Sequence, residues 1–359
     1  MFSIQSLLRP HLQNLVPYSS ARDEYTGKEG IFLDANENAY GSVTEQSFNR
    51  YPDPYQWAIK EKLAPLKGVK PSQIFLGNGS DEPIDLLIRG FCEPLVDNII
   101  ILPPTYGMYE VSATINNVPI QKVPLTPDFQ LDEKAILEAV NSQTKLIWIC
   151  SPNNPSGNIV SQEGILNILK QVNCLVVVDE AYTDFAPEQS LLSRLADFPN
   201  LVVLQTFSKA WGLASLRIGM AFANEEIVRI LNKIKPPYNI NGLTQQVLLE
   251  ALDHNDKKNE YVNDIIENRA ELAEKLASLS IVNHVFPSDA NFLLVRFTDA
   301  KGVFDYLIDN KIIVRDRSKV KWCDNALRIT VGTKGENDAL IVYLQKFVPE
   351  SVATISNLV

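Results

Sequence analysis

The sequence predicts an α/β protein, in which a mostly parallel sheet is sandwiched by helices and a smaller α/β domain follows. Short apolar segments alternate with segments of helical spacing over the first two thirds of the chain. A long amphipathic stretch then leads to a second, shorter set of strands and helices. The 359 residues favour two lobes, because single cores rarely grow beyond about 250 to 300 residues.

The strands of the larger lobe are predicted from apolar segments at residues 98–102, 146–150, 175–178 and 201–204. Such segments are apolar throughout, as in parallel strands that are covered on both faces. Helices are predicted between them at residues 132–140 and 162–171. An apolar run at 74–76 leads into a glycine turn, after which a helix opens near Ile84.

The second lobe is predicted from the pattern of the chain beyond residue 243. Residues 243–280 have the pattern of a long helix with a break near His254, and strands are predicted at 291–297, 312–315 and 326–331, with a helix at 302–309. We place the domain boundary near the start of the long helix, with a large domain at 31–245 and a small domain at 246–359. Residues 1–30 have little pattern, and we expect them to pack on the small domain.

Composition and charge exclude several classes of function. The net charge of -10 argues against a nucleic-acid or anionic-membrane surface. No signal peptide and no apolar segment of about 18 residues is found, which predicts a cytoplasmic protein that acts on small molecules. The four cysteines form no C-x-x-C pair and the three histidines no H-E-x-x-H motif, so neither a disulfide framework nor a metal centre is expected.

Lys209 is the candidate catalytic residue, in the run Thr206-Phe-Ser-Lys-Ala-Trp-Gly212. It follows the predicted strand 201–204, and open α/β sheets bind their ligands at the carboxyl ends of strands. A lysine becomes nucleophilic when desolvation or a nearby positive charge, such as that of Arg217, helps its ammonium to lose a proton. The hydroxyl of Ser208 and the guanidinium of Arg217 also suit a phosphate dianion. An amine beside a phosphate site indicates pyridoxal phosphate.

Side chains after two other strands suit the same cofactor. Asn154 lies in the loop after strand 146–150, and Asp179 and Tyr182 follow strand 175–178. The carboxyl ends of parallel strands point the same way, so these side chains are expected to converge on one crevice with the lysine. Asp179 would keep the pyridine nitrogen protonated, while Tyr182 and Asn154 would hydrogen-bond the phenolate oxygen. The freed lysine would act as the general base.

The glycine turn at 77–83 is the candidate phosphate site. Its amides near Gly79 and Ser80, followed by Asp81, open a helix and should face an anion. A capped helix without a ligand explains the turn equally well by itself. It is not a Rossmann fingerprint, because Glu82 stands where the last glycine would be. Tyr106 follows another strand and could stack on the cofactor ring.

The chain resembles the fold-type I aminotransferases, and within them the histidinol-phosphate aminotransferase family. The motifs that carry this resemblance occur in that family's order: LDANENAYG, RYPDP, FLGNGSDEPIDLLIRGF, PPTYGMY, SPNNPSGN, VVVDEAYTDF, TFSKAWGLASLRIG and LRITVGT. Ser215 stands where the superfamily commonly has glycine, and Ser156 replaces the usual threonine. Both departures are small and conservative.

The resemblance implies a role for each matched residue. Lys209 would form the Schiff base with pyridoxal 5'-phosphate, and Asp179 and Tyr182 would complete the catalytic set. The cofactor would be held by Gly79, Ser80, Asp81, Tyr106, Asn154, Asp179, Tyr182, Ser208, Lys209 and Arg217. Tyr51, from RYPDP, would reach the cofactor phosphate of the neighbouring subunit, which implies a homodimer.

Four further residues would bind the substrates. The resemblance implies that Arg328 binds the α-carboxylate of glutamate, for which a planar fork is well suited. Arg315 and Tyr18 would bind the phosphate of the other substrate, or the distal carboxylate of glutamate. Asn36, from LDANEN, would also bind substrate.

The activity implied is transfer of an amino group between glutamate and imidazole-acetol phosphate, which gives L-histidinol phosphate and 2-oxoglutarate in histidine biosynthesis. One alternative is an aromatic-amino-acid aminotransferase that uses the same pocket. Another is a related lyase of the threonine-phosphate decarboxylase kind. A regulator that only binds the cofactor would need a DNA-binding module ahead of position 30, for which we expect no room.

Overall fold

The computed structural model describes residues 3–18 and 30–348 of the chain. Within them, seven strands form one sheet: β1 (Ile74–Asn78), β2 (Asn98–Ile101), β3 (Ile120–Lys122), β4 (Thr144–Cys150), β5 (Leu175–Asp179), β6 (Leu201–Thr206) and β7 (Ile218–Ala223). Their order is β1-β7-β6-β5-β4-β2-β3, and β7 alone runs in the opposite direction to the other six strands. The predicted, mostly parallel sheet is confirmed, and the carboxyl ends of β4, β5 and β6 meet at one edge.

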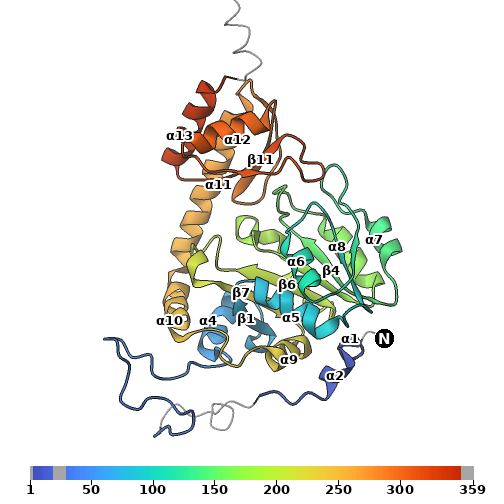
Figure 1. Ribbon diagram of the computed structural model, residues 1–359, viewed down its shortest axis with the longest axis vertical. Coiled ribbons are helices and arrows are strands. Elements are labelled where there is room, and N and C mark those ends of the chain that lie inside the picture. The colour runs from blue at the N-terminus through green and yellow to red at the C-terminus, as the bar shows by residue number, and fades with distance from the viewer. Residues whose placement is uncertain (1–2, 19–29, 349–359) are drawn as a thin grey trace, which may run out of the picture.

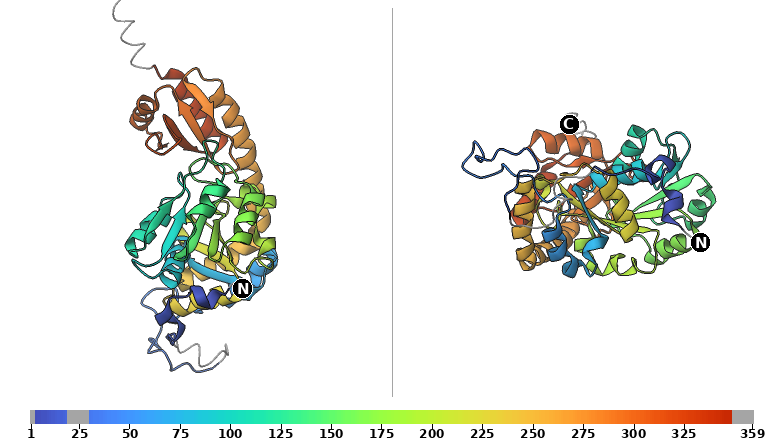
Figure 2. Two further views of the ribbon diagram at one scale, coloured as in Figure 1. Left: turned by 90° about the vertical axis from the view of Figure 1, so that its right-hand side faces the viewer. Right: turned by 90° about the horizontal axis from the view of Figure 1, so that it is seen from below.

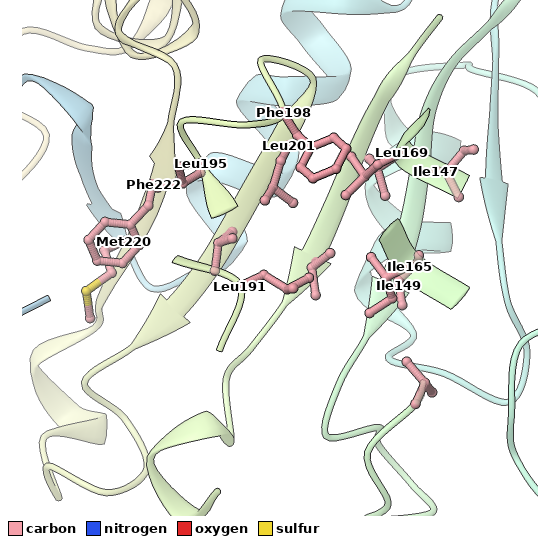
Figure 3. Close-up of a cluster of buried hydrophobic side chains, with 14 of the residues drawn as sticks. Ile147, Ile149, Ile165, Leu169, Leu191, Leu195, Phe198, Leu201, Met220 and Phe222 are labelled. Carbon is pink, nitrogen blue, oxygen red and sulfur yellow. The ribbon is translucent and has the colours of Figure 1, made fainter. Parts of the chain in front are cut away.

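Helices cover both faces of this sheet (Figure 1). The helices of the larger lobe are α1 (Ile4–Leu7), α2 (Pro10–Gln13), α4 (Trp57–Lys67), α5 (Asp81–Phe91), α6 (Met108–Ile115), α7 (Glu133–Ala139), α8 (Gln162–Gln171), α9 (Glu225–Ile234) and α10 (Gly242–Ala251). Side chains of each strand point alternately to opposite faces. Ile147 and Ile149 therefore pack with α4, α7, α8 and α10, whereas Trp148 packs with α1, α5, α6 and α9. Figure 3 shows Ile147 and Ile149 beside Ile165 and Leu169 of α8.

The smaller lobe has an antiparallel sheet and its own core. Its elements are α11 (Asn255–Ala277), β8 (Val282–Val285), β9 (Phe292–Phe297), α12 (Ala300–Asp309), β10 (Arg315–Asp316), β11 (Ala326–Thr330) and α13 (Lys334–Lys346), with the sheet order β10-β11-β9-β8. A short 3-10 turn at Leu252–His254 separates α10 from α11, where the sequence predicts a break. Helix α11 runs along one side of the molecule from the larger lobe into the smaller one (Figures 1 and 2).

The amino-terminal residues 3–18 pack on the larger lobe, although we expected residues 1–30 to pack on the small domain. The reason is local: Ile4, Leu7 and Leu8 are apolar and bury themselves against the core that α5 and α9 share. Arg9 forms an ion pair with Glu93 at 3.1 Å, which adds a polar contact on the same side. Residues 1–2 and 19–29 lie outside the described residues, and the boundary at 245/246 stays a prediction.

An arm at residues 30–56 has no helix or strand. Its first part stands away from the body of the larger lobe (Figure 1), whereas near its end Tyr51 stacks on Tyr238 and Gln56 is buried. The apolar side chains Ile31, Leu33, Tyr40 and Val43 of the arm are each at least 85% exposed. Exposed apolar residues are ordinary when they are scattered singly, whereas here several follow one another along one extended segment. Among the described residues, no helix has the length and apolar composition needed to cross a membrane.

Candidate functional site

A pocket of about 160 Å³ lies at the carboxyl ends of β4, β5 and β6. Ten of the predicted cofactor residues line it: Gly79, Ser80, Asp81, Tyr106, Asn154, Asp179, Tyr182, Ser208, Lys209 and Arg217. A larger hollow of about 710 Å³ lies beside the arm. We place the chemistry in the smaller pocket, because the amine, the buried carboxylate and the phosphate donors converge only there among the described residues.

The environment of Lys209 favours its neutral amine. Burial lowers the pKa of the Lys209 ammonium, and the positive charge of Arg328 lowers it further. Arg217, which we predicted as the activating charge, has a smaller effect on this pKa, and Asp179 opposes it. The Lys209 Nζ lies 5.4 Å from the centre of the Tyr182 ring. The Lys209 amine therefore lies over the Tyr182 ring. Because its pKa is lowered, deprotonation of its ammonium needs less free energy than usual.

Asp179 is a buried carboxylate that is held by two hydrogen bonds. The Tyr109 hydroxyl donates to Oδ2 at 2.6 Å and the Ala181 amide donates to Oδ1 at 3.1 Å. Burial raises the pKa of Asp179 to about 6, and these hydrogen bonds limit the rise. Above that pH the group is a fixed negative charge at the end of β5. It can therefore stabilise a positive ligand atom.

Tyr109 is a residue that the sequence reasoning missed. It is fully buried on α6, and its ring stacks on Trp148 with the ring centres 4.9 Å apart. The stacked ring fixes the hydroxyl that holds Asp179. The only signal in the sequence is its place one helical turn after Tyr106, in PPTYGMY.

Asn154 and Tyr182 form the wall that faces the smaller lobe. The Asn154 Nδ2 donates to the Tyr182 hydroxyl at 3.4 Å, and the Arg328 Nη1 donates to Asn154 Oδ1 at 2.5 Å. Arg328 lies on β11, so a side chain of the smaller lobe reaches the pocket of the larger one. The fold thus brings the guanidinium of Arg328 into contact with the wall of the pocket.

The phosphate end of the pocket depends on a close approach of two backbone segments. The Gly79 amide donates to the Arg217 carbonyl at 2.6 Å, with Gly79 at a φ of +68°. A Cβ on Gly219 would lie 2.2 Å from the amide nitrogen of Ser80, so only glycine fits there. The Arg217 Nη2 lies 3.3 Å from Asp81 Oδ2. The first amides of α5, the Ser208 hydroxyl and this guanidinium form a donor set suited to phosphate.

These residues fit pyridoxal phosphate on chemical grounds, since the pocket holds an amine, a buried carboxylate and a cluster of phosphate donors. The described residues contain no group of three or more His, Cys, Asp or Glu side chains that could hold a metal ion.

Other predicted site residues do not line this pocket. Tyr18 is 73% exposed beside α2 and α9, and Asn36 and Tyr51 line the hollow beside the arm. The Tyr51 ring stacks on Tyr238 with the ring centres 4.5 Å apart. Arg315 lies on β10 directly opposite Arg328. The roles of these residues stay predictions.

The family profile and the similar proteins of known name indicate the same family. The sequence profile of the family described as aminotransferase class I and II matches residues 24–344. The histidinol-phosphate aminotransferase of Cytophaga hutchinsonii is 57% identical over 346 residues, which are 96% of this chain and 99% of that relative.

Two solved structures share the fold. The histidinol-phosphate aminotransferase of Sinorhizobium meliloti, in complex with pyridoxal-5'-phosphate, has a TM-score of 0.76 at 24% identity and covers 94% of this chain and 96% of its own. The L-threonine-O-3-phosphate decarboxylase of Porphyromonas gingivalis has a TM-score of 0.72 at 24% identity and covers 84% and 91%. The predicted family and fold class are confirmed: the chain belongs to the class I and II aminotransferases and, within them, to the histidinol-phosphate aminotransferase family.

Proposed function

We propose that the protein transfers an amino group between glutamate and imidazole-acetol phosphate, giving L-histidinol phosphate and 2-oxoglutarate, with pyridoxal 5'-phosphate as cofactor. The observation that carries this proposal is the 57% identity, over nearly the whole length of both chains, to a histidinol-phosphate aminotransferase. The pocket around Lys209 agrees with it chemically. The likeness to the decarboxylase structure, at 24% identity, supports the shared fold alone.

The bound cofactor supplies a carrier for the amino group and a sink for the negative charge that develops on the substrate carbon. Asp179 would hold a proton on the pyridine nitrogen, because its carboxylate is ionised above a pKa of about 6. Asn154 and Tyr182 would orient the ring through its phenolate oxygen. The Ser80 amide, Ser208 and Arg217 would hold its phosphate, because the Gly79 amide already donates to the Arg217 carbonyl.

Lys209 would move the proton. Its lowered pKa allows the Nζ to accept a proton from the substrate carbon and to return it on the cofactor side.

The arginines of the smaller lobe would position the substrates. Arg328 already contacts Asn154 at the pocket wall, which places its guanidinium near the position of a substrate α-carboxylate. Arg315 lies opposite it on β10 and would bind the distal anionic group of either substrate. Tyr18 and Asn36 would join this site only if another copy of the chain, or a rearranged arm, brought them there. A single anion site that binds either glutamate or the phosphorylated substrate suits an enzyme whose two substrates bind one after the other.

We also propose that the protein is a cytoplasmic homodimer in which Tyr51 contributes to the partner's pocket. The exposed apolar side chains of the arm need a covering surface, and Tyr51 does not line the pocket of its own chain. Sedimentation velocity should show a dimer at micromolar concentration, and cell fractionation should place the protein in the cytoplasm. A monomer with full activity would overturn the shared site.

Hybrid dimers test the sharing directly. Tyr51→Phe chains are mixed with an excess of Lys209→Ala chains, so that most Tyr51→Phe chains are found in hybrid dimers. In such a hybrid the one intact Lys209 belongs to the Tyr51→Phe chain, and the Tyr51 that reaches it comes from the Lys209→Ala partner. Cofactor affinity at that lysine should return to the wild-type value. If the affinity stays as weak as in the Tyr51→Phe homodimer, Tyr51 acts within its own subunit.

Rates with three amino donors test the proposed reaction. With 2-oxoglutarate as acceptor, histidinol phosphate should react faster than phenylalanine, and threonine phosphate should release no carbon dioxide. Faster turnover of phenylalanine would favour an aromatic aminotransferase, and stoichiometric carbon dioxide would favour the lyase. Borohydride treatment of the holoenzyme should attach the cofactor to Lys209, which peptide mapping would locate.

A further inference from the structure

Three arginines lie on one face of the β10–β11 hairpin. Arg315 is directly opposite Arg328, and the Arg317 amide donates to the Ala326 carbonyl at 2.9 Å, which continues the same ladder by two residues. Side chains alternate between the faces of a strand, so Arg315 and Arg317 share the face of Arg328. Asp316, between them, lies opposite Leu327 on the other face. The alternation therefore gathers three positive charges on the side of the hairpin that faces the pocket.

The Arg317 side chain is half-buried, and its guanidinium has no hydrogen-bond or ion-pair partner among the described residues. Its Nε is buried without a hydrogen-bond partner in the described part of the chain. Burial, and then the positive charges of Arg328 and Arg315, lower the pKa of Arg317. None of the three arginines forms an ion pair with a carboxylate of the described residues. A buried donor without an acceptor is rare in folded proteins. A ligand anion that entered this site could accept a hydrogen bond from the Arg317 guanidinium.

The hairpin that carries Arg317 is anchored to the larger lobe. The Trp322 Nε1 donates to the Leu125 carbonyl at 3.0 Å, and the Arg296 Nη2 donates to the Trp322 carbonyl at 3.0 Å. Cys323 and Ala326 are buried in the core of the larger lobe. Arg317 shares the face of the hairpin from which Arg328 contacts Asn154 of the pocket wall.

We infer that Arg317 is a specificity residue that binds the phosphate group of the phosphorylated substrate together with Arg315, leaving Arg328 for the carboxylate of glutamate. This inference rests on the proposed function. A distal carboxylate has two oxygens and one negative charge, which a single guanidinium fork can satisfy. A phosphate dianion has three oxygens and nearly twice the charge, so it gains more from a second guanidinium. Arg317 would thus favour histidinol phosphate over both glutamate and unphosphorylated histidinol.

The two half-reactions of the holoenzyme separate this role from a structural one. In Arg317→Gln, kcat/KM for histidinol phosphate should fall roughly 10- to 100-fold through KM, the loss expected for one charge-assisted contact. The glutamate half-reaction should change by about threefold or less, because one fork still serves its carboxylate. Arg317→Lys should recover part of the loss. Lys319→Gln, an exposed residue of the same hairpin that loses the same charge, should match the wild type in both half-reactions.

Two results would overturn the inference. One is an equal loss in both half-reactions, and the other is an unchanged preference for histidinol phosphate over histidinol in Arg317→Gln. Failure of the proposed function would look different, since wild-type enzyme would not use histidinol phosphate. Inhibition of the glutamate half-reaction by inorganic phosphate would then still test Arg317. Arg317→Gln should weaken that inhibition, and an unchanged inhibition constant would contradict the role.

Discussion

The two sides of the pocket differ in how their polar groups are satisfied. On the larger lobe, Asp179 is bonded to Tyr109 and Asn154 to Tyr182, all of them buried or nearly so. On the smaller lobe, Arg315 and Arg317 have no acidic partner in the described residues. Arg328 donates to the Asn154 amide oxygen and lies 5.2 Å from the centre of the Phe292 ring. A buried network is stable when its members satisfy one another. The polar groups of the cofactor side thus stabilise one another, whereas the arginines of the substrate side remain available to bind an anionic ligand.

The largest effect is expected on the cofactor side. Lys209→Ala should lower kcat by about 10⁴-fold, the upper end for an acid–base group. Steady-state rates measured with both substrates check this. A Lys209→Ala enzyme with more than a tenth of wild-type activity would show that another group moves the proton.

Asp179→Asn should lower kcat by roughly 10²- to 10³-fold, the loss typical of one preorganised electrostatic contact. Glu180→Gln is the matched control, because Glu180 is an equally buried neighbour that bonds Ser190 and Gln205 instead of lining the pocket. Its activity should stay within about threefold of the wild type, as expected of a residue without a ligand contact. Equal losses in the two variants would mean that buried charge, and not contact with the cofactor, matters here.

The same aspartate affects the stability of the cofactor-free protein. Its pKa in the fold, about 6, lies above the ordinary value of 3.8, so the folded state binds more protons and stability falls as the pH rises from 4 through 6. Asp179→Asn should remove the share of this fall that Asp179 contributes, leaving the share of Glu180, whose pKa burial raises to about 7. It should stabilise the cofactor-free protein at pH 8 by roughly 1–3 kcal/mol. Thermal unfolding at pH 4 and pH 8 measures both quantities. An Asp179→Asn variant that is less stable than the wild type at pH 8 would contradict the view that burying the ionised carboxylate destabilises the cofactor-free protein.

On the substrate side, Arg328→Lys should raise KM for glutamate roughly 10- to 100-fold, because an ammonium cannot make the two parallel bonds of a guanidinium. The visible absorbance of the bound cofactor should stay unchanged. A changed absorbance would show that Arg328 supports the cofactor wall through Asn154, and that the two sides are less separate than their contacts indicate.

The smallest effect concerns Tyr109. Tyr109→Phe removes a hydrogen bond to Asp179 that lowers its pKa, so the acid limb of the kcat profile should move up by about one pH unit. At pH 9 the rate should match the wild type, because the carboxylate is then ionised in both. A loss that is equal at every pH would assign Tyr109 a role in packing alone.

Much of the cofactor side could be predicted from the sequence. Apolar strands that end in Asn154, Asp179 and Lys209 predict one edge of a parallel sheet, because strand direction alone brings their ends together. The order of the motifs also indicated the family. The positions of Tyr18, Asn36 and Tyr51 could not be predicted in this way, since they lie on irregular segments whose path no periodicity fixes.

Only the tertiary structure decided how the parts are paired. Tyr109 and Asp179 are 70 positions apart and meet because α6 packs on the face of the sheet that holds Trp148. Ile4 and Leu7 pack on the larger lobe because they are buried there against the apolar side chains of its core. Arg317 joined Arg315 and Arg328 through strand register, which fixes which side chains share a face. The sequence by itself determined the chemistry at the strand ends, because that chemistry depends on local pattern, whereas contacts between distant segments depend on packing.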